Sequence, residues 1–204
     1  MSRSYGQYCG LARALDVVGD RWNLLVVRQL LVGPARYRDL LDGLPGVATN
    51  LLADRLRDLE FAGVVERRSA DEGNAVVYAL TPWGAELREP VEGLIRWSTP
   101  RMTSGPGGDH FRVDWLAVAL PALLTGSRPA TVGIAVGDDL LQVRSTRTGA
   151  EVGRHDGCDL EAVLRADAPI VLGLAAGVLT FDGTAGLVDV EGDESAVRAV
   201  FSRA

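Results

Sequence analysis

The sequence predicts an α+β protein made of two domains of similar length. A run of small and chain-breaking residues, Thr103-Ser104-Gly105-Pro106-Gly107-Gly108-Asp109, divides the 204 residues almost in half and is typical of a linker. Before this run, amphipathic helical segments dominate and one pair of β segments follows them. After it, strand-like and helix-like segments alternate, which is typical of a layered domain. We therefore expect domains at 1–103 and 111–204, joined by a linker at 104–110.

Four helical segments are expected in the first half, at 8–18, 22–32, 37–41 and 49–62. Asp20 stands where an N-cap would begin the second helix, and Gly33-Pro34 would end it. This second helix is apolar on nearly every side, so we expect it to be central.

Two β segments, 64–68 and 75–80, flank a polar, glycine-containing tip at 69–74 and predict a hairpin. Thr81-Pro82 then opens a closing helix with an apolar stripe formed by Trp83, Leu87, Val91 and Leu94. Helices followed by a hairpin and a closing helix form the outline of a winged helix-turn-helix domain.

The fourth helix is the candidate DNA-recognition element. At 100° per residue, Leu52, Leu56 and Leu59 share one face, whereas Asn50, Asp54 and Arg57 point the opposite way. Asn can read an adenine edge and Arg can read guanine or contact phosphate, as a major-groove helix requires. Taken alone, the same pattern fits an ordinary amphipathic surface helix, and the hairpin directly after it favours DNA binding. The candidate DNA-binding residues are Arg36, Arg38, Thr49, Asn50, Asp54, Arg55, Arg57, Arg67 and Arg68.

The uneven charge also assigns DNA binding to the first half. The net charge is −6, but residues 1–104 hold 13 Arg and 13 acidic residues, whereas residues 105–204 hold 8 Arg and 14 acidic residues. The acidic second half would repel a polyanion.

Several ordered motifs of the first half resemble the HxlR family of bacterial regulators. They are Cys9–Trp22, Arg36-Tyr37-Arg38-Asp39-Leu40, Leu44-Pro45-Gly46, Asp54–Glu60, Gly63-Val64-Val65-Glu66-Arg67 and Tyr78–Gly84. The resemblance covers roughly residues 8–100. It implies a winged helix that forms a homodimer through its first and last helices and binds double-stranded operator DNA.

Two positions depart from the family pattern. Ala48 stands where the family often has Ser as the cap of the recognition helix, which would cost about 1 kcal/mol unless Thr49 takes over that role. Thr49-Asn50 stands where basic residues are common in the family, so base preference is not transferable.

In the second half we expect helices at 111–124, 160–166, 169–176 and 195–202, and strands at 131–136, 140–145, 178–181 and 186–190. The segments 132–143, 159–164, 177–181 and 190–197 resemble a sterol-carrier-protein-like domain. That resemblance implies an α/β fold around a cavity for an apolar small-molecule ligand. The residues that would line the cavity are Trp115, Leu116, Ala119, Leu123, Ile170, Leu174 and Phe181, and the alternative is that they simply fill the core.

Cys9 is a candidate redox residue, because a thiol near a helix N-terminus has a lowered pKa and some relatives sense electrophiles or oxidants at this position. The alternative is a small packing residue. His155-Asp156-Gly157-Cys158 is foremost a turn, since one His and one Cys do not complete a zinc site. No catalytic motif is present, so we expect neither an enzyme, nor a metal, nor another cofactor.

The sequence therefore predicts a DNA-binding transcriptional regulator, modulated by an apolar ligand in its second half. Two Cys far apart in sequence, no signal-peptide pattern and no span long enough for a bilayer predict a cytoplasmic protein without membrane insertion. The alternatives are a lipid-binding or scaffold protein that uses the winged helix for protein contacts, a thiol-sensing regulator that acts through Cys9, and a regulator whose second domain is only structural.

Overall fold

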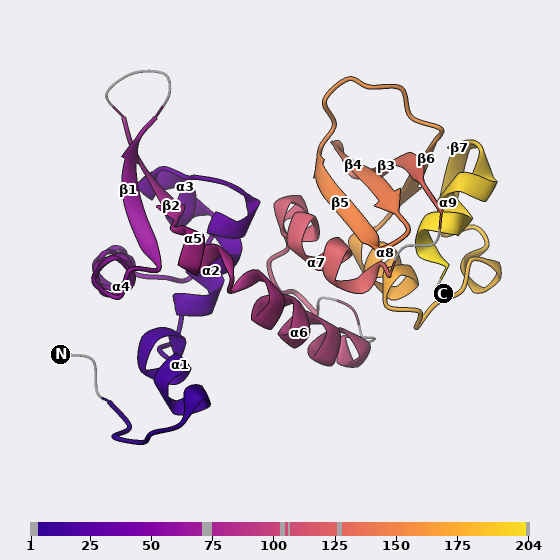
Figure 1. Ribbon diagram of the computed structural model, residues 1–204. Helices are drawn as coiled ribbons and strands as arrows, with labels where there is room; N and C mark the ends of the chain where they lie inside the picture. Colours follow the sequence, from indigo (N-terminus) through magenta and orange to yellow (C-terminus); the bar gives the residue numbers. More distant parts are fainter. Residues whose placement is uncertain (1–3, 71–74, 103–104, 106, 126–127, 203–204) are drawn as a thin grey trace. The chain divides into compact units, whose positions relative to one another are not determined.

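The computed structural model describes residues 4–70, 75–102, 105, 107–125 and 128–202 (Figure 1). Its contacts divide the chain into two compact units, Met1–Val91 and Glu92–Ala204. This division falls inside a helix, earlier than the linker predicted at 104–110. Residues 104 and 106 of that linker lie outside the described residues, so the linker stays a prediction.

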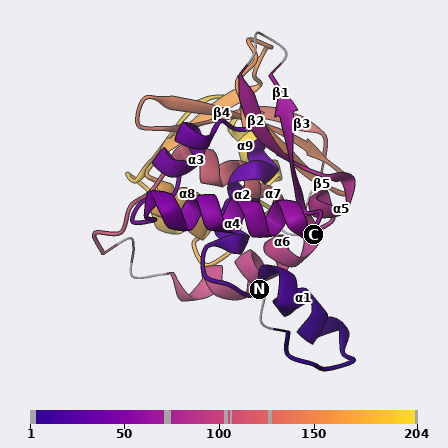
Figure 2. The ribbon, with the colours of Figure 1, turned by 90° about the vertical axis from the view of Figure 1, so that its left-hand side faces the viewer.

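Unit 1 is built on four helices: α1 (Gly10–Val18), α2 (Asn23–Val32), α3 (Tyr37–Asp42) and α4 (Thr49–Phe61). The expectation that the second helix is central is confirmed, because Val26, Val27 and Leu30 of α2 are buried. α2 packs against α4 and against the second hairpin strand. Figure 2 shows α4 from the side, with the two hairpin strands extending away from it.

The start of α2 differs from the prediction. Trp22, not Asp20, is the N-cap residue, and its φ of 86° lies in the left-handed region. The backbone turns sharply here because the carbonyl oxygen of Asp20 accepts a hydrogen bond from the N–H of Asn23 (3.1 Å). The Asp20 carboxylate is instead paired with Arg55 of α4, a partner that local sequence does not reveal.

The predicted hairpin is present as β1 (Val65–Ser69) and β2 (Val76–Leu80), paired antiparallel from Val65–Leu80 to Ser69–Val76. Residues 71–74 of the predicted tip lie outside the described residues. Ala35, in the segment between α2 and α3, pairs with Tyr78 of β2 through two backbone hydrogen bonds of 3.0 and 2.8 Å. The hairpin is therefore tied to the helices, as a wing must be.

The closing helix is broken into α5 (Pro82–Ala85) and α6 (Arg88–Ser98). Thr81 caps α5 by accepting a hydrogen bond from the N–H of Gly84. Pro90 lacks an N–H group and cannot continue the hydrogen bonding of α5, which accounts for the interruption. Gly84 packs so closely on the backbone of Val64 that a Cβ at this position would lie 2.0 Å from the Val64 carbonyl oxygen.

Unit 2 contains a mixed five-stranded sheet with the strand order β5-β4-β3-β6-β7. Its strands are β3 (Ala130–Val136), β4 (Asp139–Thr146), β5 (Gly149–Arg154), β6 (Ala162–Ala166) and β7 (Val188–Gly192). β3 and β6 are parallel, and the other neighbours are antiparallel. Because β6 lies beyond β3 in the sheet, the chain that leaves β5 must cross both β4 and β3.

Helices α7 (Leu116–Leu123), α8 (Ala168–Ala175) and α9 (Glu194–Phe201) contribute to one apolar core with alternate strand residues such as Val132, Ile134 and Leu164. Short 3-10 turns lie at Thr99–Arg101, Val113–Trp115 and Asp182–Thr184. Asp193 begins α9 as an N-cap that accepts a hydrogen bond from Ser195. The helix expected at 111–124 is present as the shorter α7, which contains Pro121.

Two expectations for unit 2 are wrong, and one of its strands was not expected. Residues 160–166, expected as a helix, supply strand β6, because pairing on both sides outweighs the helix propensity of Leu, Glu and Ala. Residues 178–181, expected as a strand, form a turn that leads into a 3-10 helix. Edge strand β5 was not expected, since Gly149, Gly153 and its charged residues hide the strand pattern.

In the part of the chain that the structure describes, no helix is long and apolar enough to cross a membrane.

Candidate nucleic-acid interface

Helix α4 has the two faces that the sequence predicts. Leu52, Leu56 and Leu59 are fully buried against unit 1, whereas Asn50, Asp54 and Arg57 are exposed. Phe61, at the end of the same helix, is also almost fully exposed, at 97%. Phe61 was not among the expected site residues, although the 100° spacing places it on the same face as Asn50.

The first turn of α4 is held by neighbours rather than by a side-chain cap. Ala48 is the N-cap residue and provides no capping hydrogen bond, and none is provided by Thr49. The side-chain oxygen of Asn50 accepts a hydrogen bond from the N–H of Leu51 (2.9 Å). The Tyr37 hydroxyl donates to the carbonyl oxygen of Thr49 (2.6 Å) and fastens α3 to the start of α4.

The arginines of the α4 front and of the wing are paired with acidic neighbours. Arg57 pairs with Asp54 one helical turn away. On β1, Arg68 donates from Nε to Glu66 (2.7 Å). The sequence spacing of Asp54 and Arg57 already allowed such a pair.

Arg67 of the wing has the most contacts of these cations. Its Nε lies 2.8 Å from Oε1 of Glu60, and its guanidinium lies 5.5 Å from the centre of the Tyr78 ring. The hydrogen bond to Glu60 raises the pKa of Arg67, so the residue stays cationic. Arg67 therefore joins the last turn of α4 to the hairpin.

Arg36 and Arg38 stand at the start of α3, and both are exposed. The backbone N–H of Arg36 donates to Asp39 (3.0 Å), which closes the first turn of that helix. Within the described residues, neither guanidinium has an ion pair. Both are therefore available to an anionic partner.

Arg55 is placed on the flank of α4, away from the exposed front. Its side chain is only 17% exposed and pairs with Asp20 and, at 3.4 Å, with Asp58. Its Nε atom is buried without a partner. In this position Arg55 links the recognition helix to the turn between α1 and α2.

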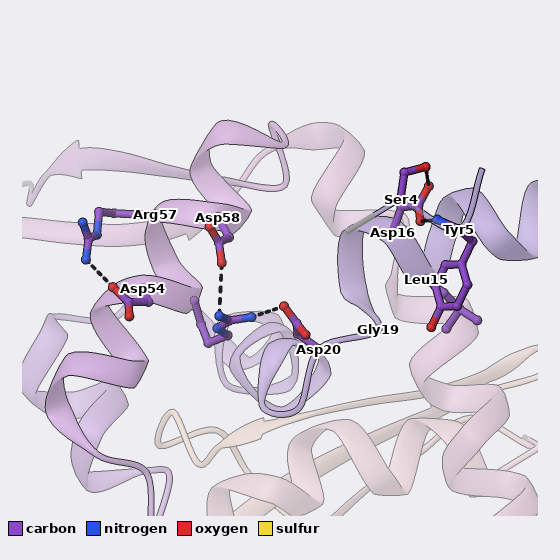
Figure 3. Close-up of a pocket in the computed structure, with 10 residues that line it drawn as sticks. Ser4, Tyr5, Leu15, Asp16, Gly19, Asp20, Asp54, Arg57 and Asp58 are labelled. Carbon is purple, nitrogen blue, oxygen red and sulfur yellow. Dashed lines mark hydrogen bonds and ion pairs between the residues drawn. The ribbon is translucent and has the colours of Figure 1, made fainter. Parts of the chain in front are cut away.

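A polar hollow of about 760 Å³ lies beside this link, between α4 and α1 with its preceding segment (Figure 3). The hollow is lined by Ser4, Tyr5, Leu15, Asp16, Gly19, Asp20, Asp54, Arg55, Arg57 and Asp58. The Tyr5 backbone N–H donates to Asp16 (2.8 Å) and lowers the pKa of this carboxyl. With four carboxylates against two guanidiniums, the hollow does not suit a phosphate group.

Cys9 is the N-cap residue of α1, and it is exposed. The backbone N–H groups of Ala12 and Leu11 lower the pKa of the Cys9 thiol. A thiolate is the reactive form of cysteine, so this environment favours reaction with electrophiles. Because Cys9 is exposed, its side chain does not serve as a small packing residue within the single chain.

The residues expected to line an apolar cavity in unit 2 belong largely to its core. Leu116, Leu123 and Leu174 are buried in the main cluster, and Ile170 and Phe181 pack against it. Trp115 and Ala119 are half-buried on or next to α7. This arrangement agrees with the core-filling alternative, and the cavity stays a prediction.

Comparison with known proteins gives a match to the HxlR-like helix-turn-helix family over residues 17–105. The chain is 33% identical over 86 residues to the HTH-type transcriptional regulator YodB of Bacillus subtilis. The aligned segment covers 42% of this chain and 77% of YodB. It is 34% identical over 88 residues to the regulator YvaP of the same organism, covering 43% of this chain and 82% of YvaP. The solved structure of reduced YodB matches 50% of this chain and 99% of its own, with 30% identity and a TM-score of 0.41.

The family match covers the segment that contains α2, α3, α4 and the β1–β2 hairpin. Unit 1 therefore has the winged helix-turn-helix fold that the order of its elements predicts. The chain belongs to the HxlR-like helix-turn-helix family and is a DNA-binding transcriptional regulator.

Proposed function

We propose that this regulator binds double-stranded operator DNA as a homodimer, with α4 in the major groove and the β1–β2 hairpin against the backbone. The observation that carries the proposal is the exposed polar front of α4 on a fully buried apolar back, followed directly by a hairpin with Arg67 and Arg68. A regulator of this kind acts where the chromosome lies, so the proposal places the chain in the cytoplasm of a bacterial cell.

The proposed contacts fall into two groups. Asn50, Asp54 and Arg57, with Thr49 beside them, would face base edges. Arg36, Arg38, Arg67 and Arg68 would contact phosphates and fix the orientation of the duplex. Arg55 has a different role, because Asp20 and Asp58 hold it on the flank, where it positions α4.

Binding must break the pairs Arg57–Asp54 and Arg68–Glu66. Exposed ion pairs contribute only about 0–1 kcal/mol, so phosphate or guanine replaces the acidic partner at small cost. The neighbouring acids also weaken attraction to DNA that offers no specific contact, which favours selectivity over affinity.

The homodimer is supported by exposed apolar side chains on the first and last helices of the family domain. Leu11 and Leu15 of α1 are exposed, as are Trp83 of α5 and Leu94 and Trp97 of α6. Exposed apolar side chains gathered on one element usually mark a contact surface. Light scattering should return a dimer at micromolar concentration. The variant Leu11→Glu should favour the monomer, and Leu187→Glu, which alters an exposed leucine of unit 2, should not.

DNA contacts are tested by selecting genomic fragments on the full chain and measuring affinity by fluorescence anisotropy. Asn50→Ala should relax base preference and cost roughly 1–3 kcal/mol on the selected operator. Arg68→Ala should weaken all sequences alike and reduce the salt slope by about 1. Arg147→Ala, an exposed arginine of unit 2, is the matched control and should change neither. Wild-type binding by Asn50→Ala and Arg68→Ala would exclude this docking.

For unit 2 we propose a sterol-carrier-protein-like domain that binds an apolar small molecule and tunes DNA binding. The support is a mixed sheet and three helices that share one apolar core. Coupling of about 1–3 kcal/mol would change operator affinity by about 5–150-fold. Native mass spectrometry would detect a retained lipid, and comparison of stripped with fatty-acid-loaded protein would measure the coupling. Equal operator affinity of the two forms would refute the sensor role.

Thiol sensing through Cys9 is a second candidate function, favoured by an exposed thiol whose pKa is lowered by two backbone N–H groups. A diamide-treated or quinone-treated chain should lose operator affinity, and the Cys9→Ser variant should keep it. Cys158→Ser is the control that should respond like wild type. Equal loss of affinity in Cys9→Ser would exclude this role.

A further inference from the structure

The chain that leaves β5 crosses the sheet on the face opposite the apolar core of unit 2. Residues 155–161 form this crossover, since β5 is an edge strand and β6 lies beyond β3. At its start, the N–H of His155 donates to the carbonyl oxygen of Leu140 (3.3 Å). Near its end, Leu160 packs over Gly133, where a Cβ would approach Leu160 to 2.9 Å.

Three side chains of different chemistry converge at the beginning of this crossover. The ligand atoms of His155, Asp156 and Cys158 all lie within 4.8 Å of one another. Gly157, with a φ of 89°, turns the chain so that the residues on either side of it face one another. The N–H of Cys158 donates to Asp156 Oδ1 (3.1 Å), which holds the carboxylate in this turn.

A buried glutamine from the sheet reaches into the same cluster. Gln142 of β4 is only 4% exposed, and its side-chain amide lies below the crossover. Its Oε1 position is 3.0 Å from Cys158 Sγ and 3.3 Å from Nδ1 of His155. These separations are close to those between neighbouring ligands of a tetrahedral zinc ion, whose bonds are about 2.0–2.3 Å long.

We propose that His155, Asp156 and Cys158 bind a thiophilic divalent cation of the Zn²⁺ or Co²⁺ type, with the Gln142 carbonyl oxygen as a fourth ligand. An imidazole nitrogen, a carboxylate oxygen and a thiolate are the donor types of such ions. On binding, the Cys158 thiol releases its proton to solvent and the sulfur forms the bond to the metal. Residues 155–158 were expected to form only a turn, because one His and one Cys do not complete a zinc site; Asp156 and Gln142 of β4 would supply the further ligands.

The Gln142 amide has a second orientation that suits the metal-free chain. With the amide turned over, its nitrogen donates to Asp156 Oδ1 (2.9 Å) and to His155 Nδ1 (3.3 Å), and its oxygen accepts from Arg144. Turning the amide therefore exchanges a donor for an acceptor at the centre of the cluster. The oxygen-inward orientation suits a cation, and the nitrogen-inward orientation replaces the cation by hydrogen bonds.

Arg144 takes the place of the cation in the metal-free state. Its guanidinium lies 2.6 Å from Asp156 Oδ2, so it competes with a metal for the carboxylate. We expect Arg144→Gln to bind the metal more tightly than wild type. This competition also makes the site selective for ions that bind thiolate and imidazole strongly, since a hard cation that relies on Asp156 would not displace Arg144.

The direct test is a Co²⁺ titration of the chelator-treated full chain, followed by the absorption of the thiolate-to-cobalt charge-transfer band. The protein has two cysteines, so Cys9→Ser is a matched control that should keep the band. Cys158→Ser should lose the band, and Cys158→Ser and His155→Ala should each weaken Zn²⁺ binding by at least about tenfold. Calorimetry should give one Zn²⁺ per chain.

A second measurement does not depend on the folding of the ligand variants. In Cys9→Ser the remaining thiol is Cys158, and Zn²⁺ should slow its alkylation by iodoacetamide. Magnesium at the same concentration should not slow it. The proposal is overturned by unchanged alkylation in Zn²⁺, or by a cobalt band that survives in Cys158→Ser. In either case the cluster serves only to fasten the crossover to the sheet.

Discussion

Replacing Asp54 by Asn should tighten the binding of this regulator to DNA, because the change releases Arg57 from its ion pair. The two side chains are 50% and 68% exposed and pair across one turn of α4. An exposed pair of this kind contributes about 0.2–1 kcal/mol, which binding must first overcome. Its removal should therefore lower the dissociation constant by about 1.4- to 5-fold.

The salt dependence gives an independent value for the same effect. A freed guanidinium that meets one more phosphate should steepen the slope of log affinity against log salt concentration by about 0.9. Fluorescence anisotropy on a non-specific duplex, measured over a series of salt concentrations, provides both quantities. Measurement on the selected operator separates a second role, because base reading by Asp54 itself would appear as a loss confined to the operator.

Asp58→Asn is the matched control for this experiment. It removes the same charge from the same helix, but Asp58 pairs with Arg55 at 3.4 Å, and Asp20 also holds that arginine. Asp58→Asn should thus show only the general effect of one negative charge less. Equal changes in affinity and slope for the two variants would refute the assignment of Arg57 to the DNA-binding front.

Three further predictions concern packing, pH and thiol reactivity. Gly84→Ala should lower the free energy of unfolding in urea by roughly 1–3 kcal/mol, since its Cβ would lie 2.0 Å from the backbone oxygen of Val64. Gly10→Ala is the control and should not destabilise the protein, because a Cβ at Gly10 meets nothing within 4 Å. Equal stability of the two variants would contradict this packing. The pKa of Asp156 is lowered from 3.8 to about 2, chiefly by its hydrogen bond from Arg144, so its stabilising effect is complete above pH 3.8 and is lost as the pH falls through about 2. With chelator present, the difference in melting temperature between wild type and Asp156→Asn should narrow over that range, and a constant difference would show that the carboxylate does not stabilise the fold in this way. Alkylation of Cys9 in the Cys158→Ser variant should have its midpoint below the ordinary thiol pKa of 9.0, and a midpoint at or above that value would argue against an activated thiol.

The local pairing of cations explains how a chain with a net charge of −6 can act on DNA. Arg57 on the front of α4 and Arg68 on the wing each pair with an acidic residue of the same element, Asp54 and Glu66. Long-range attraction to any duplex is therefore modest, and affinity must come from contacts that a particular sequence offers. A strong salt-independent part of operator binding is the expected consequence.

Elements with strong local signals could be predicted from the sequence. The buried side of α4 follows from the spacing of Leu52, Leu56 and Leu59, and the structure confirms it. The hairpin follows from two β-rich segments around a polar tip, and its strands are present at Val65–Ser69 and Val76–Leu80. In both cases periodicity and chain breakers within a short window are enough, because the interactions involved are local.

Elements that depend on distant partners could not be predicted in this way. Residues 162–166 have helix-forming composition and nevertheless form a strand, since β3 and β7 supply pairing on both edges. Likewise Asp20, expected as the N-cap of the second helix, instead pairs its carboxylate with Arg55 of α4. Tertiary context overrides local propensity at such positions.

The sequence by itself determined the order of the helices and hairpin in the first half, the apolar back of α4 and the family to which the chain belongs. These features depend on residue types at short, regular spacings. Only the tertiary structure decided that Arg55 turns to Asp20, and that Gln142 meets His155, Asp156 and Cys158. Each of these contacts joins residues from different elements, and side-chain direction there is set by the packing of whole elements rather than by their neighbours in the chain.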